Sequence, residues 1–201
     1  MGLSLWLVPS PLEAKKLGFV INSQRKDPSL SVASYPKFYP HITLASLPQS
    51  LETELDKIAG SIPTFDAHAP LRCYFDQVKI GDHYFRSVYV AIKPTREILS
   101  LYEEVHQRLG LEPRCPAFPH MSLCYIDDAD AINGERDRFY DELRTSAVIG
   151  FKTEEPEAVQ LNCGSEGTNN WVDNFKAHEV WAVRCEGPVE SWEVLHKIPL
   201  N

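Results

Sequence analysis

The sequence contains Tyr-Pro-His-Ile-Thr-Leu at Tyr39–Leu44 and, in a related form, Phe-Pro-His-Met-Ser-Leu at Phe118–Leu123. Both copies read aromatic residue, Pro, His, apolar residue, hydroxyl residue and Leu. A repeated core strand requires only apolar residues at alternate positions, so the matching His and hydroxyl positions need another explanation. The repeat predicts one site that is built from two half-sites.

The polar residues of each copy share one face of an extended strand, because alternate side chains point the same way. His41 lies beside Thr43, and His120 lies beside Ser122. The apolar residues that alternate with them point to the opposite face. We therefore expect the polar faces to line a cleft and the apolar faces to join the core.

Length and composition indicate an ordinary globular protein. The chain has 201 residues, of which 43% are apolar and 24% charged. This length suits a single domain over residues 1–201, built as one large unit or two lobes. No apolar run is long enough to span a membrane, and Met1–Pro11 lacks the basic start of a secretory signal.

Cysteine usage favours a reduced, intracellular and cytoplasmic protein, because the number of Cys is odd and no CxxC motif occurs. The sequence leaves open whether a disulfide forms, such as one between Cys73 and Cys185. The five cysteines are Cys73, Cys115, Cys124, Cys163 and Cys185.

The charge pattern indicates a small substrate, and we expect the protein to be a monomer. The formal net charge is −8, and no dense stripe of Lys and Arg is present to bind a long nucleic acid. The five His outside the motifs show no metal-ligand spacing, so we expect no metal and no cofactor, and we place these His at the surface or in loops. They are His68, His83, His106, His178 and His196.

Hydrophobic spacing and turn residues predict an α+β fold with mainly antiparallel strands. The predicted strands are Ser4–Val8, His41–Leu47, Leu71–Ile80, Tyr84–Lys93, Met121–Ile126, Ala158–Leu161, Glu179–Glu186 and Trp192–Pro199, with a hairpin turn at Gly81-Asp82-His83. The predicted helices are Pro11–Ser23, Leu51–Ala59 after an N-cap at Ser50, Thr95–Leu109 ending at Gly110, and Ala129–Leu143 with a break at Asn133-Gly134.

Two imidazoles can supply a general base and a general acid near neutral pH. Hydrolysis of a cyclic phosphodiester needs this pair, because one His activates water while the other protonates the sugar oxygen that leaves. Thr43 and Ser122 can donate hydrogen bonds to the phosphate oxygens. A five-membered cyclic phosphate is strained, so the reaction does not require a metal. The sequence leaves open which His is the base.

Other groups carry weaker signals. Cys124 shares the strand face of His120, but it has no phosphatase or papain-like context, so we interpret it as a small buried residue. Gly164–Gly167 lacks the P-loop pattern and is at most a backbone anion nest. Several aromatic residues on or beside the predicted strands could stack on a base. They are Trp6, Tyr84, Phe85, Tyr125 and Trp171.

The paired motifs His41-Ile42-Thr43 and His120-Met121-Ser122 resemble those of the two-histidine (2H) phosphoesterase superfamily. The resemblance runs along nearly the whole chain and is greatest to the fungal and plant cyclic nucleotide phosphodiesterases. It implies a bilobal fold of two pseudo-symmetric antiparallel sheets with outer helices and a central cleft. The implied catalytic residues are His41 and His120.

The resemblance also implies binding residues and substrates. Thr43, Ser122 and Tyr125 would bind phosphate, while Trp6 and Phe85, or Tyr84 in place of Phe85, would border the substrate. The implied reactions open ADP-ribose 1″,2″-cyclic phosphate to ADP-ribose 1″-phosphate and nucleoside 2′,3′-cyclic phosphates to 2′-phosphates. The segments Asp127–Glu157 and Asn162–Asn170 match no pattern of the family.

Three alternatives remain at this stage. An RNA-end-processing relative, such as a 2′,5′ ligase, a 2′,5′ phosphodiesterase or a 3′ exonuclease, needs a basic groove that leads to the His pair. A non-catalytic module would bind a nucleotide without turnover. A structural protein would bury the two motifs far apart.

Overall fold

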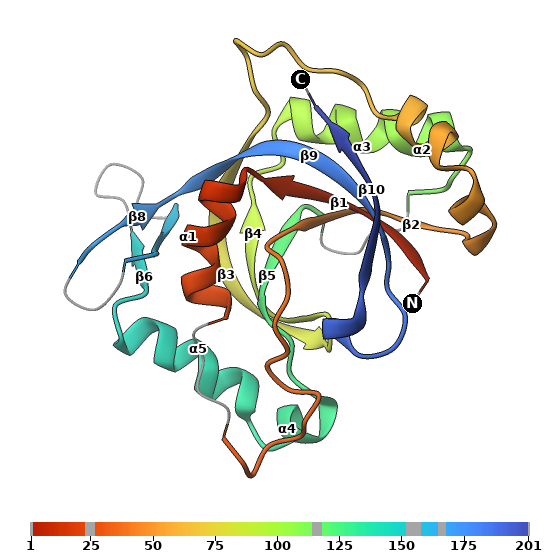
Figure 1. Ribbon diagram of the computed structural model, residues 1–201. Coiled ribbons are helices and arrows are strands. Elements are labelled where there is room, and N and C mark those ends of the chain that lie inside the picture. The colour runs from red at the N-terminus through yellow and green to blue at the C-terminus, as the bar shows by residue number, and fades with distance from the viewer. Residues whose placement is uncertain (1, 23–26, 114–117, 152–157, 165–167, 201) are drawn as a thin grey trace.

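The computed structural model describes residues 2–22, 27–113, 118–151, 158–164 and 168–200 (Figure 1). Its strands are β1 (Leu3–Pro9), β2 (Ile42–Leu47), β3 (Arg72–His83), β4 (Arg86–Ile92), β5 (His120–Cys124), β6 (Ile149–Phe151), β7 (Val159–Asn162), β8 (Trp171–Val172), β9 (Asn174–Arg184) and β10 (Glu193–Pro199). Its α-helices are α1 (Pro11–Ile21), α2 (Leu55–Ser61), α3 (Arg96–Leu109), α4 (Asp128–Ile132) and α5 (Glu135–Thr145), and 3-10 turns cover Gln49–Thr53 and Val189–Ser191.

The main sheet follows the order β1-β2-β5-β4-β3-β9-β10, and all its neighbouring strands are antiparallel. A further pairing joins β1 to β9, so that six of these strands form a closed ring with β10 on its outside. A small second sheet contains β6, β7 and β8. The predicted α+β class with antiparallel sheets is confirmed.

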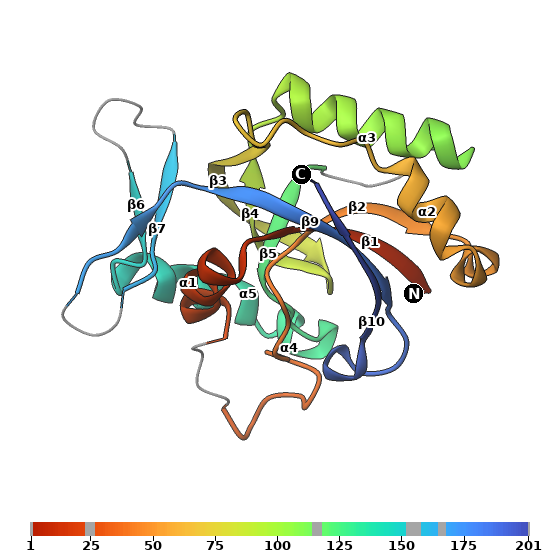
Figure 2. The ribbon, with the colours of Figure 1, turned by 45° about the horizontal axis from the view of Figure 1, so that its top comes forward.

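The helices lie outside the strands (Figure 2). α2 packs against α3, which covers β2, while α5 lies against β3 and β4. α1 contacts β1 and β5, and it turns its buried residues towards them. Within the described residues, no helix has the length and apolar character needed to cross a membrane.

The first strand is buried on both faces, which explains its continuous apolar run. Leu5 and Leu7 point into the main core, where both are fully buried. Trp6 and Val8 point to the other side and pack in a second cluster with residues of β9. β1 therefore separates the core from the side of the sheet on which Trp6 lies.

The two repeated strands are neighbours in the sheet. Ile42 pairs with Met121, and these are the residues that directly follow the two motif His. Ile42, Met121, Leu44 and Leu123 are all fully buried in the main core. The predicted apolar faces of both motifs are confirmed, and their polar faces lie on the same side of one sheet.

The hairpin turn lies later in the chain than predicted. β3 continues through Gly81 to His83, which pairs with Arg86, so Tyr84 and Phe85 form the turn. A Cβ at Gly81 would lie 1.9 Å from the carbonyl oxygen of Arg86. Gly81 therefore permits the two strands to approach closely and does not mark the turn.

The helix predicted after an N-cap at Ser50 was also wrong. A 3-10 turn covers Gln49–Thr53, and Glu54 leaves the helical conformation before α2 begins. The 3-10 turn contributes the buried residue Leu51, and α2 contributes the buried residue Ile58. Two short elements therefore provide the contacts expected of one helix.

Other predicted elements are confirmed, with shifts at their ends. α3 ends at Gly110, whose φ is 68°, and Gly134, with φ 84°, separates α4 from α5. β9 begins several residues before the predicted strand at Glu179, and β6 and β8 were not predicted. α1 ends at Ile21, slightly before the predicted end, and Ser23 and the centre of Gly164–Gly167 lie outside the described residues.

Candidate active site

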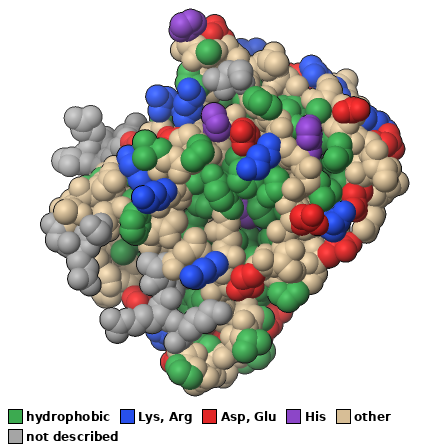
Figure 3. All heavy atoms as spheres, viewed as in Figure 1, with side chains coloured by type: hydrophobic (Ala, Val, Ile, Leu, Met, Phe, Trp, Pro, Cys, Tyr) green, Lys and Arg blue, Asp and Glu red, His purple; other side chains and the backbone are tan. Residues whose placement is uncertain are grey.

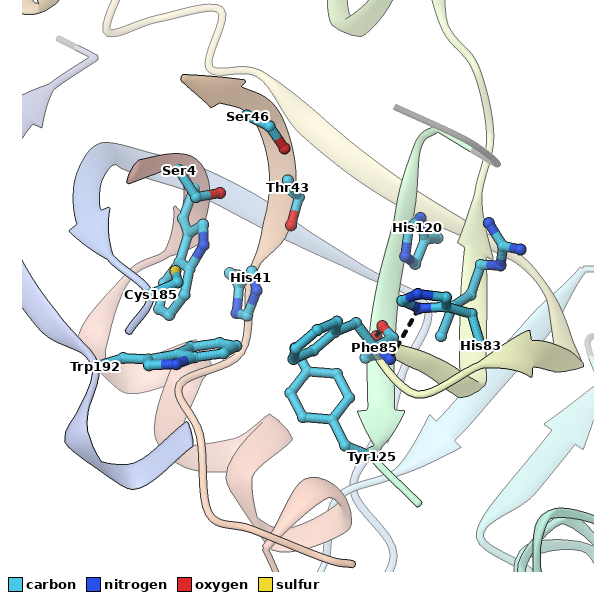
Figure 4. Close-up of a pocket in the computed structure, with 13 residues that line it drawn as sticks. Ser4, His41, Thr43, Ser46, His83, Phe85, His120, Tyr125, Cys185 and Trp192 are labelled. Atoms are coloured by element: carbon cyan, nitrogen blue, oxygen red, sulfur yellow. Dashed lines mark hydrogen bonds between the residues drawn. The ribbon is translucent and has the colours of Figure 1, made fainter. Parts of the chain in front are cut away.

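Both motifs open onto one cavity with a volume of about 330 Å³. Its walls come from β1, β2, the β3–β4 hairpin, β5 and the C-terminal part of the chain (Figure 4). On the face shown in Figure 3, hydrophobic side chains gather near the centre and a His side chain is visible among them. The lining residues are Ser4, Trp6, His41, Thr43, Ser46, His83, Phe85, Arg86, His120, Ser122, Tyr125, Cys185 and Trp192.

The imidazole of His41 is held on two sides. Its Nδ1 lies 2.7 Å from the carbonyl oxygen of Tyr39, which can only accept, so Nδ1 carries the proton. The ring stacks on Trp6 with centroids 3.8 Å apart and an interplanar angle of 9°. These contacts fix the tautomer of His41 and leave Nε2 as the atom for proton exchange.

The same surroundings keep His41 uncharged at neutral pH. Burial lowers the pKa of His41 to about 4, the hydrogen bond to Tyr39 opposes this change, and the charge of His120 adds to it. The charge effect also indicates that the two imidazoles are close.

His120 begins β5 and faces the cavity from the strand next to His41 (Figure 4). Its ring meets the ring of Tyr89, on β4, edge to face with centroids 5.2 Å apart. The side chain is partly exposed, unlike that of His41. The two His therefore line one cavity in different surroundings.

Three of the hydroxyl groups that line the cavity belong to residues predicted for the site, namely Thr43, Ser122 and Tyr125. Thr43 is partly exposed on β2, and the Oγ of Ser122 donates to the carbonyl oxygen of Phe85 at 2.8 Å. Burial raises the pKa of Tyr125 well above its ordinary value, so the phenol keeps its proton. All the polar residues that the motifs predicted for the site, together with Tyr125, are brought together.

Strict alternation would place Tyr125 on the face opposite Ser122. The register between β4 and β5 shifts between Ser122 and Cys124, so that Cys124 turns into the core and Tyr125 faces the cavity. Its ring stacks on Phe38 at 4.2 Å, and its carbonyl oxygen accepts from the N–H of Tyr35 at 2.8 Å. The loop before β2 therefore holds Tyr125 in place.

Aromatic side chains form one wall of the cavity. Trp6 and Phe85 line it as predicted, and sequence reasoning missed Trp192. The ring centroid of Trp192 lies 5.7 Å from those of both Trp6 and Phe85. Among the described residues, the Nε1–H of Trp192 is buried without a hydrogen-bond partner. No motif spacing in the sequence points to this residue.

A family model described as "Cyclic phosphodiesterase-like protein" matches residues 1–200. The chain belongs to this family of 2H phosphoesterases. Membership makes the protein a hydrolase of phosphodiester bonds.

Curated relatives match this chain over all or nearly all of their length. Proteins named 2′,3′-cyclic-nucleotide 3′-phosphodiesterase are 29% identical in Kluyveromyces lactis, covering 100% of both chains, and 26% identical in Yarrowia lipolytica, covering 97% of this chain and 98% of the relative.

Solved structures of E. coli LigT show the same fold. The complex with 3′-AMP has a TM-score of 0.54 at 14% identity and covers 100% of this chain and 98% of that chain. The form without ligand has a TM-score of 0.51 at 14% identity, with 100% and 97% covered.

The structure corrects one interpretation of a His residue and adds to another. His83 is exposed, as expected, but it also lines the cavity. His106 is buried in α3, where its Nδ1 lies 2.7 Å from the carbonyl oxygen of Tyr102. The turn at Tyr84 and Phe85 brings His83 to the cavity, and the apolar face of α3 buries His106.

Cys124 and two aromatic residues lie apart from the cavity lining. Cys124 is buried, and burial raises the pKa of its thiol well above the ordinary value, so it is a poor nucleophile. Tyr84 donates to the carbonyl oxygen of Ala33 at 2.8 Å, and Trp171 packs over Gly150 in the small sheet. The interpretation of Cys124 as a small buried residue is confirmed.

The described cysteines carry free thiols, and they are Cys73, Cys124, Cys163 and Cys185. Cys115 lies outside the described residues. The disulfide between Cys73 and Cys185 that the sequence left open is not formed.

Proposed function

We propose that this protein hydrolyses small cyclic phosphodiesters by metal-independent acid–base catalysis, with residues 1–201 acting as one bilobal domain. Its substrates are nucleoside 2′,3′-cyclic phosphates, opened to 2′-phosphates, and ADP-ribose 1″,2″-cyclic phosphate, opened to ADP-ribose 1″-phosphate. The observation that carries the proposal is that His41 and His120 line the same cavity from neighbouring strands. The names of the yeast relatives support the first substrate class.

His41 acts as the general base in this reaction. Its Nδ1 proton is bonded to Tyr39, so Nε2 holds a free electron pair while the ring is neutral. The lowered pKa keeps the ring neutral at pH 7. Nε2 removes a proton from water as the water oxygen forms its bond to phosphorus.

His120 acts as the general acid. The bond between phosphorus and the leaving sugar oxygen breaks roughly opposite the attacking water. A proton from His120 passes to that oxygen, and the product is a phosphomonoester with a free hydroxyl group. After turnover, His41 carries the proton taken from water and His120 lacks the proton given to the sugar oxygen, and proton exchange with the solvent restores both residues.

Thr43, Ser122 and Tyr125 bind the non-bridging oxygens of the phosphate. The hydroxyl of Ser122 donates to the carbonyl oxygen of Phe85 in this structure, and rotation about its C–O bond turns the proton towards a bound phosphate. Tyr125 contributes a phenol that stays protonated. These donors stabilise the negative charge that grows on the phosphate in the transition state.

Trp6 and Phe85 border the sugar and base of the substrate. A cavity of about 330 Å³ suits one nucleotide unit better than a long strand. On the face shown in Figure 3, positive side chains are scattered among negative ones and form no continuous stripe. We therefore favour a small substrate over an RNA-end-processing role. We propose separately that the protein acts as a monomer in the cytoplasm.

Product analysis tests the proposal. Purified protein is incubated with adenosine 2′,3′-cyclic phosphate and, separately, with ADP-ribose 1″,2″-cyclic phosphate, each with an excess of EDTA. We expect adenosine 2′-phosphate and ADP-ribose 1″-phosphate. Binding without turnover of either compound would indicate a nucleotide-binding module, and turnover only after metal addition would refute metal independence.

A further inference from the structure

The β3–β4 hairpin brings two basic side chains to one rim of the cavity. His83 and Arg86 are partners across the hairpin, and both line the cavity. Figure 4 places His83 on the His120 side, away from His41 and Trp192. Among the described lining residues, Arg86 is the one Lys or Arg. Because the chain has a net charge of −8, a positive side chain at the rim of the cavity is a candidate contact for an anionic substrate.

The guanidinium of Arg86 is available to a ligand. One nitrogen lies 2.6 Å from a carboxylate oxygen of Asp82, and the Arg86 side chain is 21% exposed while that of Asp82 is 87% exposed. The exposed carboxylate of Asp82 occupies one nitrogen of the guanidinium, which leaves other N–H groups of the planar fork for a second acceptor. Phosphate oxygens match that fork well.

His83 adds a second donor. Its Nδ1 accepts from the backbone N–H of Phe85 at 3.3 Å, as the dashed line in Figure 4 shows. A neutral ring with an accepting Nδ1 carries its proton on Nε2, which is a donor. The hairpin therefore presents Arg86 and His83 side by side, while its turn residue Phe85 forms part of the aromatic wall.

We propose that His83 and Arg86 form a second anion subsite, which binds a phosphate or diphosphate on the 5-position oxygen of the same ribose that carries the cyclic phosphate. This rests on the proposed function, in which the cyclic phosphate lies between His41 and His120. The enzyme then prefers nucleotides with a second phosphate over nucleosides that carry the cyclic phosphate alone. The same two side chains can bind either a nucleotide 5′-phosphate or the diphosphate of an ADP-ribose derivative.

Binding of product-like ligands tests the subsite without turnover. Calorimetry measures the Kd of adenosine 2′-phosphate, adenosine 2′,5′-bisphosphate and 2′-phosphoadenosine 5′-diphosphate. We expect the bisphosphate to bind about tenfold more tightly than the monophosphate, because one charge-assisted hydrogen bond contributes a difference of about that size. A further gain with the third ligand would assign the subsite to a diphosphate, and no gain would assign it to a single phosphate.

Two variants of Arg86 test its contribution to the subsite. Arg86→Gln should remove most of the difference between the first two ligands, and Arg86→Lys should restore part of it. Arg108→Gln is the matched control, because Arg108 forms a similar surface pair with Glu104, 2.9 Å away on α3. Equal affinities in the wild type, or a tenfold difference that persists in Arg86→Gln, would overturn the subsite.

These measurements separate the subsite from the proposed reaction. A wild type that binds the bisphosphate more tightly but hydrolyses no cyclic phosphate would retain the subsite and refute the activity. A wild type that hydrolyses cyclic phosphates with no preference for a second phosphate would retain the activity and refute the subsite.

Discussion

Ile42 is the antiparallel partner of Met121, and each of these residues directly follows one motif His. This register brings His41 towards Ser122 and Thr43 towards His120, because neighbours of an antiparallel pair run in opposite directions. Each half of the repeat therefore provides an imidazole beside the hydroxyl residue of the other half. One hydrogen-bonded strand pair is enough to assemble the polar groups of the site.

Replacement of either motif His should remove most of the activity. We expect kcat to fall about 10²–10⁴-fold in His41→Gln and in His120→Gln, because each variant lacks one proton-transfer group. The double variant should lose little more, since the residues act as a unit. His68→Gln changes an exposed loop residue and is the control. A single motif variant that keeps a tenth of the activity would contradict the paired roles.

The pH dependence of kcat/KM should distinguish the base from the acid. A base must be uncharged, and the pKa of His41 is lowered to about 4. With His41 as base, kcat/KM should stay high as the pH falls from 7 to 5 and decline near pH 4, where the ring becomes protonated. If His41 were the acid, kcat/KM would rise as the pH falls towards 4. Circular dichroism at each pH checks that the protein stays folded.

The stacked pair of Trp6 and His41 should control both the position and the pKa of the imidazole. In Trp6→Phe we expect kcat to fall about tenfold and the acidic limb of the pH profile to move upwards, because a smaller ring buries His41 less. Trp181→Phe is the matched control, since Trp181 pairs with Trp6 across the sheet, is also buried and lies apart from the cavity lining. An unchanged pH profile in Trp6→Phe would show that the stack does not set this pKa.

Two glycines should respond oppositely to alanine. At Gly81 a Cβ would lie 1.9 Å from a backbone oxygen, so Gly81→Ala must displace the hairpin that carries His83 and Phe85. We expect the free energy of unfolding to fall by about 2 kcal/mol or more and the activity to decrease. Gly60, in α2, has no atom within 4 Å of its added Cβ, and Gly60→Ala should stabilise by up to about 1 kcal/mol. Urea unfolding measures the stability of both variants. Equal changes in the two variants would contradict the close approach of Gly81 to Arg86.

The sequence predicted the centre of the site because the repeat is local and chemically specific. Alternation alone placed His41 with Thr43 and His120 with Ser122, and the structure keeps both pairs on the cavity side. Tyr125 required the resemblance to a family, because simple alternation from Ser122 would place it on the wrong face.

The rim of the site could not be predicted from local patterns. Trp192 comes from a distant part of the chain and carries no motif, so only the tertiary fold reveals that it faces Trp6. His83 and Arg86 depended on the exact hairpin turn, which the sequence placed too early because Gly81 resembles a turn residue. The closed ring of strands was also not apparent, since the pairing of β1 with β9 is set by packing of the whole chain.

The position of β1 has a consequence for biosynthesis. β1 is made before the other strands of the ring, yet one of its two neighbours in the sheet is β9, which ends at Arg184. Contacts over such a sequence separation form slowly, and the ring cannot close until β9 has left the ribosome. Until then the apolar β1 keeps one edge unpaired, and an unpaired strand edge is a place where other chains can pair.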